Sequence, residues 1–369
     1  MATGRPSPAE RYTVVDMDAH YITDFDDLAE YVDDDDPWSL LLENAQSREE
    51  NSSNNSKTFP KVGGATSVSG AFEVSEAAPS NLKSTEDVKE VMAELSLDWC
   101  HLLSNRMLTF GLMTLDDRRQ EVFANAYTDY MLDTILDVEE GIVMSLPVPY
   151  NRPQAAADLI ERVGDEDAIV GICFVTGRME PPAGHRKYDP IYEAAQEKGL
   201  PAVYHSGNAF NDGFYMDGFS SYLETHSLGF VWDNMAQLTS VICQGLPEKF
   251  PDLDFVFQES GLFWIPQIMY RLDTEYLRNE WQAPLLEKRP SEYMKERFYF
   301  CTQPIEAPPT QKYLEYVIEM LGGPERLMYA SDYPHTDYDA PSSITDLSFL
   351  SSEEKAGILG ENALEVFDV

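Results

Sequence analysis

Basic residues are scarce in this sequence, where 26 Lys and Arg stand against 65 Asp and Glu and give a net charge of −39. The acids are scattered along the chain and also form the run Asp33–Asp36. Such a surplus repels nucleic acid and anionic membranes, so we expect neither as a partner. The pattern is typical of a halophilic surface, whose self-repulsion is screened by salt. An acidic protein from an ordinary mesophile is the alternative.

Cysteines and long apolar runs are few as well. No Cys-x-x-Cys spacing occurs, which excludes a zinc knuckle. The widely separated cysteines are instead expected to be buried thiols of a protein in a reducing compartment. The four cysteines are Cys100, Cys173, Cys243 and Cys301. No stretch approaches the roughly 18 consecutive apolar residues of a membrane span, and the N-terminus MATGRPSPAERY lacks the apolar part of a signal peptide. We therefore expect a soluble cytoplasmic protein.

Short β-rich runs alternate with helix-length segments along the chain. Several runs are continuously apolar, as in parallel strands that are covered on both faces. The eight runs are YTVVDMDAHYI, DWCHLLS, GIVMSLPV, AIVGICFV, PAVYHSG, DFVFQESG, RFYFCTQ and RLMYASDYPH. They predict an α/β fold, a (β/α)8 TIM barrel, as a single domain over residues 1–369. The rival, an open doubly wound sheet, should carry a Gly-rich phosphate turn, and none is present.

One stretch interrupts the alternation. Residues 33–87, rich in Asp, Ser, Asn and Glu, include the block NSSNNS and cannot support a core of their own. We interpret them as an insertion after the first strand. It either lies over the barrel mouth as a lid or is a plain surface insertion.

The first run, VVDMDAHYI, carries Asp16, Asp18 and His20 at alternate positions. Alternate side chains of a strand share one face, and in a barrel that face points inward. A buried carboxylate costs several kcal/mol or more unless it is paired, hydrogen-bonded or bound to a cation. A divalent metal would remove this cost for Asp18 and His20. Taken alone, the pair could equally be structural.

Polar residues also end later runs, where barrel enzymes place their chemistry. His205 ends the fifth run and Asp332 the eighth, while Glu259 and Gln303 follow the sixth and seventh. With Asp18 and His20, the first two make a four-ligand set. Imidazoles and carboxylates together suit Zn²⁺, Mn²⁺ or Fe²⁺, with zinc slightly favoured, and leave a position for water or substrate.

Several motifs in combination resemble the amidohydrolase-related family, in the branch of the aminocarboxymuconate semialdehyde, resorcylate and isoorotate decarboxylases. They are DMDAH, YDPIYEAAQEKGLPAVYHSG, FPDLDFVFQESGLFWIPQIMYRLD, MYASDYPH and GENALEVF. The resemblance runs from Val14 to Phe367, without the insertion. It implies a metal-dependent barrel in which Asp18, His20, His205 and Asp332 surround one ion.

The sequence departs from that family's pattern at three points. The first-strand pair is Asp-x-His where many relatives have His-x-His or Glu-x-His, so the site is more acidic and Asp16 is an alternative ligand. Glu259 stands where the decarboxylases commonly place a catalytic His, and a carboxylate can serve as the acid or base. The fourth run has no Lys, which excludes a carbamylated lysine bridge. We expect one metal.

Three further residues are candidates for substrate contact or proton transfer. His226 lies in the expected loop after the fifth strand and is either catalytic or a surface histidine. Arg178, after the fourth strand, could hold a substrate carboxylate, although loop arginines are usually solvated. His335, close to Asp332, is expected to contact substrate or to orient that carboxylate.

We therefore predict a mononuclear metal enzyme that acts on a small carboxylated or cyclic substrate by non-oxidative decarboxylation or by hydrolysis. Glu259 would be its acid or base, and Asp332 would ligate the ion and help to move the proton. The alternative is a catalytically silent barrel that binds a ligand or a partner. A homodimer is possible, with GLFWIP (residues 261–266) contributing to an interface.

Overall fold

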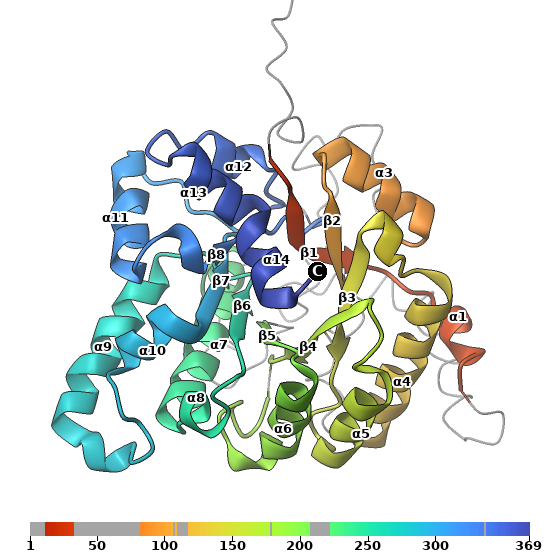
Figure 1. Cartoon of the computed structure of the whole chain (residues 1–369), viewed down its shortest axis with the longest axis horizontal. Helices are drawn as coiled ribbons and strands as arrows, with labels where there is room; N and C mark the ends of the chain where they lie inside the picture. The colour runs from red at the N-terminus through yellow and green to blue at the C-terminus, as the bar shows by residue number, and fades with distance from the viewer. Residues whose placement is uncertain are drawn as a thin grey trace, which may run out of the picture.

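Eight parallel strands form one sheet in the order β1 to β8 in a computed structural model, with helices around them (Figure 1). The model describes residues 12–32, 82–105, 108, 117–177, 179–206, 222–335 and 337–369. The strands are β1 (Val15–Tyr21), β2 (Trp99–Ser104), β3 (Ile142–Pro147), β4 (Ile169–Val175), β5 (Ala202–His205), β6 (Phe255–Gln258), β7 (Phe298–Cys301) and β8 (Leu327–Met328). Each lies within one of the eight predicted runs, and the predicted TIM barrel is confirmed.

The helices cover the outside of the sheet with apolar stripes. In α4, for example, Phe123, Tyr127 and Met131 are buried, while Val122 is half-buried. The helices are α1 (Phe25–Ala29), α3 (Thr85–Leu95), α4 (Asp117–Thr134), α5 (Pro153–Val163), α6 (Asp189–Lys198), α7 (Tyr222–Cys243), α8 (Leu246–Lys249), α9 (Trp264–Asn279), α10 (Pro290–Arg297), α11 (Gln311–Leu321), α12 (Ser342–Thr345), α13 (Ser352–Ala356) and α14 (Asn362–Phe367). Short turns are η3 (Val138–Glu140), η4 (Arg186–Tyr188), η7 (Glu280–Gln282), η8 (Pro324–Arg326) and the π-helical η9 (Gly357–Glu361).

The last strand closes the barrel against the first. The backbone N–H of Asp332 donates to the carbonyl of Asp18 at 2.7 Å, and that of His20 donates to the carbonyl of Tyr333 at 2.7 Å. The buried carboxylate of Asp16 accepts from the Ser331 backbone N–H at 2.7 Å and from its hydroxyl at 2.5 Å. Asp16 in β1 therefore binds the segment after β8 and helps to hold the last strand against the first.

Replacing Ser331 with alanine should lower the free energy of unfolding by about 1–3 kcal/mol, because one oxygen of a buried carboxylate loses its hydroxyl donor. Urea unfolding at fixed salt would measure the change. The control is Ser343→Ala, which removes a hydroxyl that has no hydrogen-bond partner among the described residues. Equal losses in the two variants would contradict this role for Ser331.

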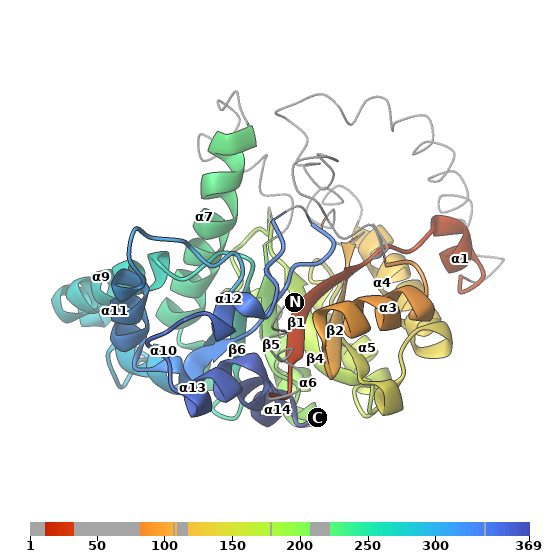
Figure 2. The ribbon, with the colours of Figure 1, turned by 90° about the horizontal axis from the view of Figure 1, so that it is seen from above.

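The two ends of the barrel differ. At the end where α14 lies in Figure 2, the Phe367 ring packs against His101 with centroids 5.5 Å apart. His101 bridges the carbonyl of Met17 and the hydroxyl of Ser145, each at 2.8 Å. The first turns of α7 project at the opposite end (Figure 2), which is the end with the carboxyl termini of the strands. His101 is thus a structural residue of the barrel floor.

The structure bears on two segments that the sequence analysis singled out, the insertion and residues 261–266. Most of the expected insertion lies outside the described residues, which resume at Leu82, paired with Tyr21, and α3 begins at Thr85, close to the expected upper boundary of about 87. The segment 261–266 does not offer an apolar surface, since Leu262, Trp264 and Ile265 are buried in the chain's own core.

Among the described residues, no helix combines the length and apolar character needed to cross a membrane.

Candidate metal centre

Four side chains predicted as metal ligands meet at the carboxyl ends of the strands. Asp18 and His20 lie near the end of β1, His205 is the last residue of β5, and Asp332 follows β8. The Nε2 atom of His20 lies 3.3 Å from Asp18 Oδ1 and 3.0 Å from Asp332 Oδ1. The Nε2 atom of His205 lies 3.5 Å from the same oxygen of Asp18. Residues separated by more than three hundred positions in the sequence are thus within a few ångströms of one another.

These side chains form two overlapping groups that could hold a metal ion. The groups are Asp18–His20–His205 and His20–Asp332–His335, and in each the possible ligand atoms all lie within 4.8 Å of one another. Asp18, His20 and Asp332 are fully buried, and His205 is nearly so. Because His20 belongs to both groups, one ion beside it would be within reach of all four predicted ligands.

The hydrogen bonding of these groups fits a bound cation. Both carboxylate oxygens of Asp18 and both ring nitrogens of His20 and His205 are buried, and none makes a hydrogen bond within the described ranges. A buried polar atom without a partner costs about 1–3 kcal/mol. The Nε2 atoms of His20 and His205 lie 3.0–3.5 Å from carboxylate oxygens but without hydrogen-bond geometry, so a shared cation would partner all six atoms. Oxygen and imidazole ligands suit a divalent ion.

The electrostatics of the site favour positive charge. Burial alone would lower the pKa of His20, but its interactions with Asp18 and Asp332 outweigh burial and raise that pKa to about 10. Burial would likewise raise the pKa of Asp18, but His205 and His20 hold it below its usual range. The two carboxylates therefore stabilise a proton or a cation at this position.

Asp332 has an unusual backbone conformation, and two side chains contact its carboxylate. Its φ of +63° lies in the left-handed region, which few non-glycine residues adopt. The Nδ1 atom of His335 is 2.6 Å from Asp332 Oδ1, and Gln303 Nε2 donates to Oδ2 at 3.1 Å. His335 is therefore in direct contact with Asp332, and its role in orienting that carboxylate stays a prediction. Gln303 was expected only at a strand end, and nothing in the sequence paired it with Asp332.

Glu259 stands beside the group that includes His205. Its φ is +54°, and its Oε2 atom lies 3.0 Å from His205 Nε2. It is 6% exposed. Burial above all, and then the carboxylates of Asp332 and Asp18, raise the pKa of Glu259 well above the usual range of a carboxyl. Strained backbone at two of the site's carboxylates is typical of functional positions.

Three other residues were predicted from the sequence as possible site residues: Asp16, His226 and Arg178. Asp16, the alternative ligand, is hydrogen-bonded to Ser331 and belongs to neither group. The expected loop position of His226 is wrong, because this residue lies in α7, with Nε2 3.4 Å from Asp337 Oδ2. The first turns of α7 expose apolar residues such as Leu223 and so lack an amphipathic pattern. Arg178 lies outside the described residues.

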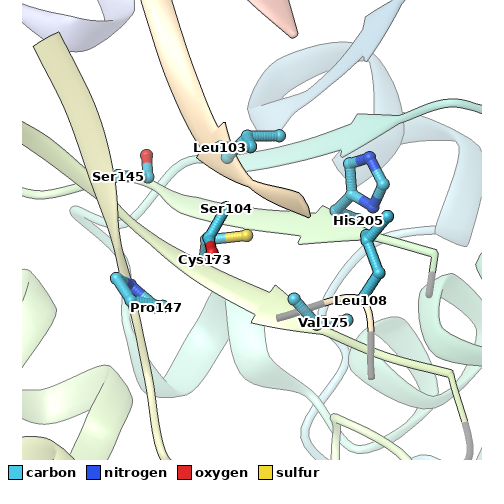
Figure 3. Close-up of a pocket in the computed structure, with 8 residues that line it drawn as sticks. All are labelled: Leu103, Ser104, Leu108, Ser145, Pro147, Cys173, Val175 and His205. Carbon is cyan, nitrogen blue, oxygen red and sulfur yellow. The ribbon is translucent and has the colours of Figure 1, made fainter. Parts of the chain in front are cut away.

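A small pocket adjoins the metal centre, with the His205 ring on its wall (Figure 3). The space that it encloses is small, with room for about one water molecule, and it opens toward solvent. The lining is mostly apolar and comes from β2 to β5 and a neighbouring segment: Leu103, Ser104, Leu108, Ser145, Pro147, Cys173, Val175 and His205. The hydroxyl of Ser104 is buried and has no hydrogen-bond partner in the described part of the chain.

Comparisons with known proteins agree with this arrangement. The chain is 23% identical over 233 residues to a γ-resorcylate decarboxylase from Rhodococcus jostii (strain RHA1), covering 60% of this chain and 68% of that one. Its fold resembles an amidohydrolase from Mycobacterium avium subsp. paratuberculosis K-10 (TM-score 0.70, 15% identity, 96% and 99% of the chains). It also resembles a 5-carboxyvanillate decarboxylase from Novosphingobium aromaticivorans DSM 12444, solved with manganese and 4-hydroxy-3-methoxy-5-nitrobenzoic acid (TM-score 0.68, 18% identity, all of both chains).

The family assignment rests on a match to a family model. Residues 103–369, well over half of the chain, match the family described as Amidohydrolase. The matched part includes β5 and the segment after β8, which supply His205 and Asp332. The resemblance inferred from the sequence motifs is thereby confirmed, and the chain belongs to the Amidohydrolase family of enzymes.

Proposed function

We propose that this protein is a divalent-metal-dependent enzyme that removes CO₂ from a small aromatic acid without an oxidant. The observation that carries the proposal is the group of buried, unpartnered ligand atoms of Asp18, His20 and His205 beside an apolar pocket. Hydrolysis was the other branch predicted from the sequence. The relatives named as decarboxylases of hydroxylated benzoates favour decarboxylation.

The ion would be held by Asp18, His20, His205 and Asp332. We propose manganese in place of zinc, which the sequence slightly favoured. Two carboxylates in a set of four make the site rich in oxygen, which suits Mn²⁺. The Novosphingobium decarboxylase was solved with manganese, which supports the same choice. When bound, the ion would supply positive charge that orients an anionic substrate and stabilises charge developing on it.

The substrate's ring would lie against the apolar lining, at the open side of this pocket. Leu103, Leu108 and Val175 offer apolar contacts, and the Ser104 hydroxyl could bond a ring substituent. His205 lies on the pocket wall, so a ring placed there would present its polar edge to the metal centre (Figure 3). Arg178 remains a predicted partner for a substrate carboxylate.

In the reaction, the bond between the ring carbon and the carboxylate breaks and its electron pair stays on the ring carbon. That carbon then takes a proton, and CO₂ leaves. Glu259, buried beside His205, would donate this proton and regain one from solvent. His335 and Gln303 would hold Asp332 in position. His226, with Asp337, would assist proton exchange at the rim of the site.

The test is an assay of the full chain purified in high salt. Protein stripped with a chelator and reloaded with Mn²⁺ should convert γ-resorcylate, or a related hydroxybenzoate, to CO₂ and the matching phenol. The stripped protein should be inactive. CO₂ release and chromatography of the phenol would measure the reaction.

Two results would overturn the proposal. Hydrolysis of amides or lactones by the reloaded protein, with no CO₂ from any hydroxybenzoate, would assign it to the hydrolase branch. Protein that never binds metal would support the silent barrel.

A further inference from the structure

The turn after β6 contains two residues with a left-handed backbone. Glu259 has a φ of +54° and Gly261 has a φ of +66°. Glycine adopts this conformation without steric cost, but in glutamate the Cβ atom crowds the backbone. The peptide group between Gln258 and Glu259 is a planar unit, and its rotation would move φ of Glu259 into the favoured negative range. Other contacts must therefore hold this peptide group in its observed orientation.

Asn234, a residue of α7, makes those contacts. Its Nδ2 atom donates to the Gln258 carbonyl at 2.6 Å and to the Ser260 hydroxyl oxygen at 2.8 Å. The amide has two hydrogens, so each of them serves a residue next to Glu259. Asn234 and Gln258 are fully buried and Ser260 is nearly so, which keeps bulk water from replacing these bonds. The orientation of the Gln258 carbonyl, and with it φ of Glu259, therefore depends on Asn234.

The part of α7 that carries Asn234 is itself anchored to the barrel. Asp233, the preceding residue, is buried and accepts from the Thr176 hydroxyl at 2.5 Å. The backbone N–H of Thr176 donates to the carbonyl of His205 at 2.9 Å, at the end of β5. Groups that are supported by packed elements keep their geometry better than groups on loops. Asn234 therefore supports the turn from a fixed position.

We propose that Asn234 is a positioning residue, which holds the Glu259 carboxyl beside His205. The inference rests on the proposed function, in which Glu259 donates the proton to the ring. The Glu259 Oε2 atom lies 3.0 Å from His205 Nε2. Rotation of the peptide before Glu259 would turn its side chain away from this direction, and a displacement of about 1 Å can cost a reaction about 100-fold in rate. Both of these hydrogen bonds of Asn234 go to the turn, so it acts through Glu259.

Steady-state kinetics of the full chain loaded with Mn²⁺ tests this inference. Asn234→Ala should lower kcat by about 10- to 100-fold. KM and bound Mn²⁺ should change little, because Asn234 belongs to neither group of possible metal ligands. In a Glu259→Gln background the same substitution should change kcat by less than about two-fold, since the group through which Asn234 acts is already lost. A purely structural role in the core would lower kcat equally in both backgrounds.

Gln237→Ala is the matched control. Gln237 lies about one turn further along α7, is also buried, and accepts from the Ala183 backbone N–H at 2.8 Å. This variant removes an amide of the same helix that belongs to another part of the barrel, so kcat should stay within about two-fold of the unmodified chain. Equal losses in Asn234→Ala and Gln237→Ala overturn the inference, as does a loss from Asn234→Ala that persists in the Glu259→Gln background.

A crystal structure of Asn234→Ala supplies a measurement that does not depend on the reaction. We expect Glu259 at negative φ, with its carboxyl moved away from His205. A carboxyl that keeps its place beside His205 overturns the inference. Circular dichroism would verify that the variants are folded, and Asn234→Leu, which fills the same space without a donor, is the second variant. A reloaded chain that releases no CO₂ would overturn the proposed function alone, because the position of Glu259 in this crystal structure still decides the role of Asn234.

Discussion

Asp332→Asn should lower kcat/KM for the decarboxylation by about 1,000-fold or more. The substitution removes one of two carboxylates that face the ion, and the charge stabilisation a metal provides is worth several kcal/mol, at about 1.4 kcal/mol for each factor of ten. Asparagine is the informative replacement because it tolerates the left-handed backbone at φ +63°, whereas alanine would add strain. Metal analysis of the purified variant should show less bound Mn²⁺ than the unmodified chain holds.

The control for this experiment is Asp339→Asn. Asp339 belongs to the same segment after β8, and its carboxylate accepts from the Ile305 backbone N–H at 2.8 Å, a bond that an asparagine oxygen can keep. It should retain both metal and activity. If Asp332→Asn kept full activity with its metal bound, the ligand set would have to exclude Asp332.

Glu259→Gln should lower kcat by a factor of about 100 to 10,000, the usual contribution of a positioned acid or base. Glutamine keeps the size of the side chain and can still bond His205, but it cannot donate a carboxyl proton. KM and metal content should change little, because Glu259 belongs to neither group of possible metal ligands. Steady-state kinetics with metal analysis would separate these effects.

Glu306→Gln makes the same chemical change nearby, outside the site. The Glu306 carboxylate accepts from the backbone N–H groups of Leu262 and Phe263 before α9, so this variant should remain active. Loss of metal from Glu259→Gln in proportion to its loss of activity would identify Glu259 as a ligand. An unchanged kcat would assign the proton to another group.

The barrel was predictable because its strands are buried on both faces. Several of the predicted runs are continuously apolar, as in covered parallel strands, and the eight observed strands lie within the eight runs. The ends of elements were harder. α7 begins before His226, in turns that project beyond the barrel and bury little, so no apolar periodicity marks them.

The site was predictable in its residue types and less so in its pairings. The two-residue period of a strand places Asp16 and Asp18 on the same face, so the sequence could not tell which of them is the ligand. What distinguishes Asp16 is its contact with Ser331, which lies 315 residues further along the chain. Gln303 could be placed at a strand end, but its hydrogen bond to Asp332 depends on how β7 and β8 lie side by side. Local pattern carries no information on such contacts.

The closure of β8 against β1 also sets when the metal centre can form. Asp18 and His20 leave the ribosome early, whereas Ser331 and Asp332 emerge near the end of synthesis. A nascent chain therefore holds half of the ligands long before the last one exists. The four predicted ligands can therefore come together only after translation is almost complete.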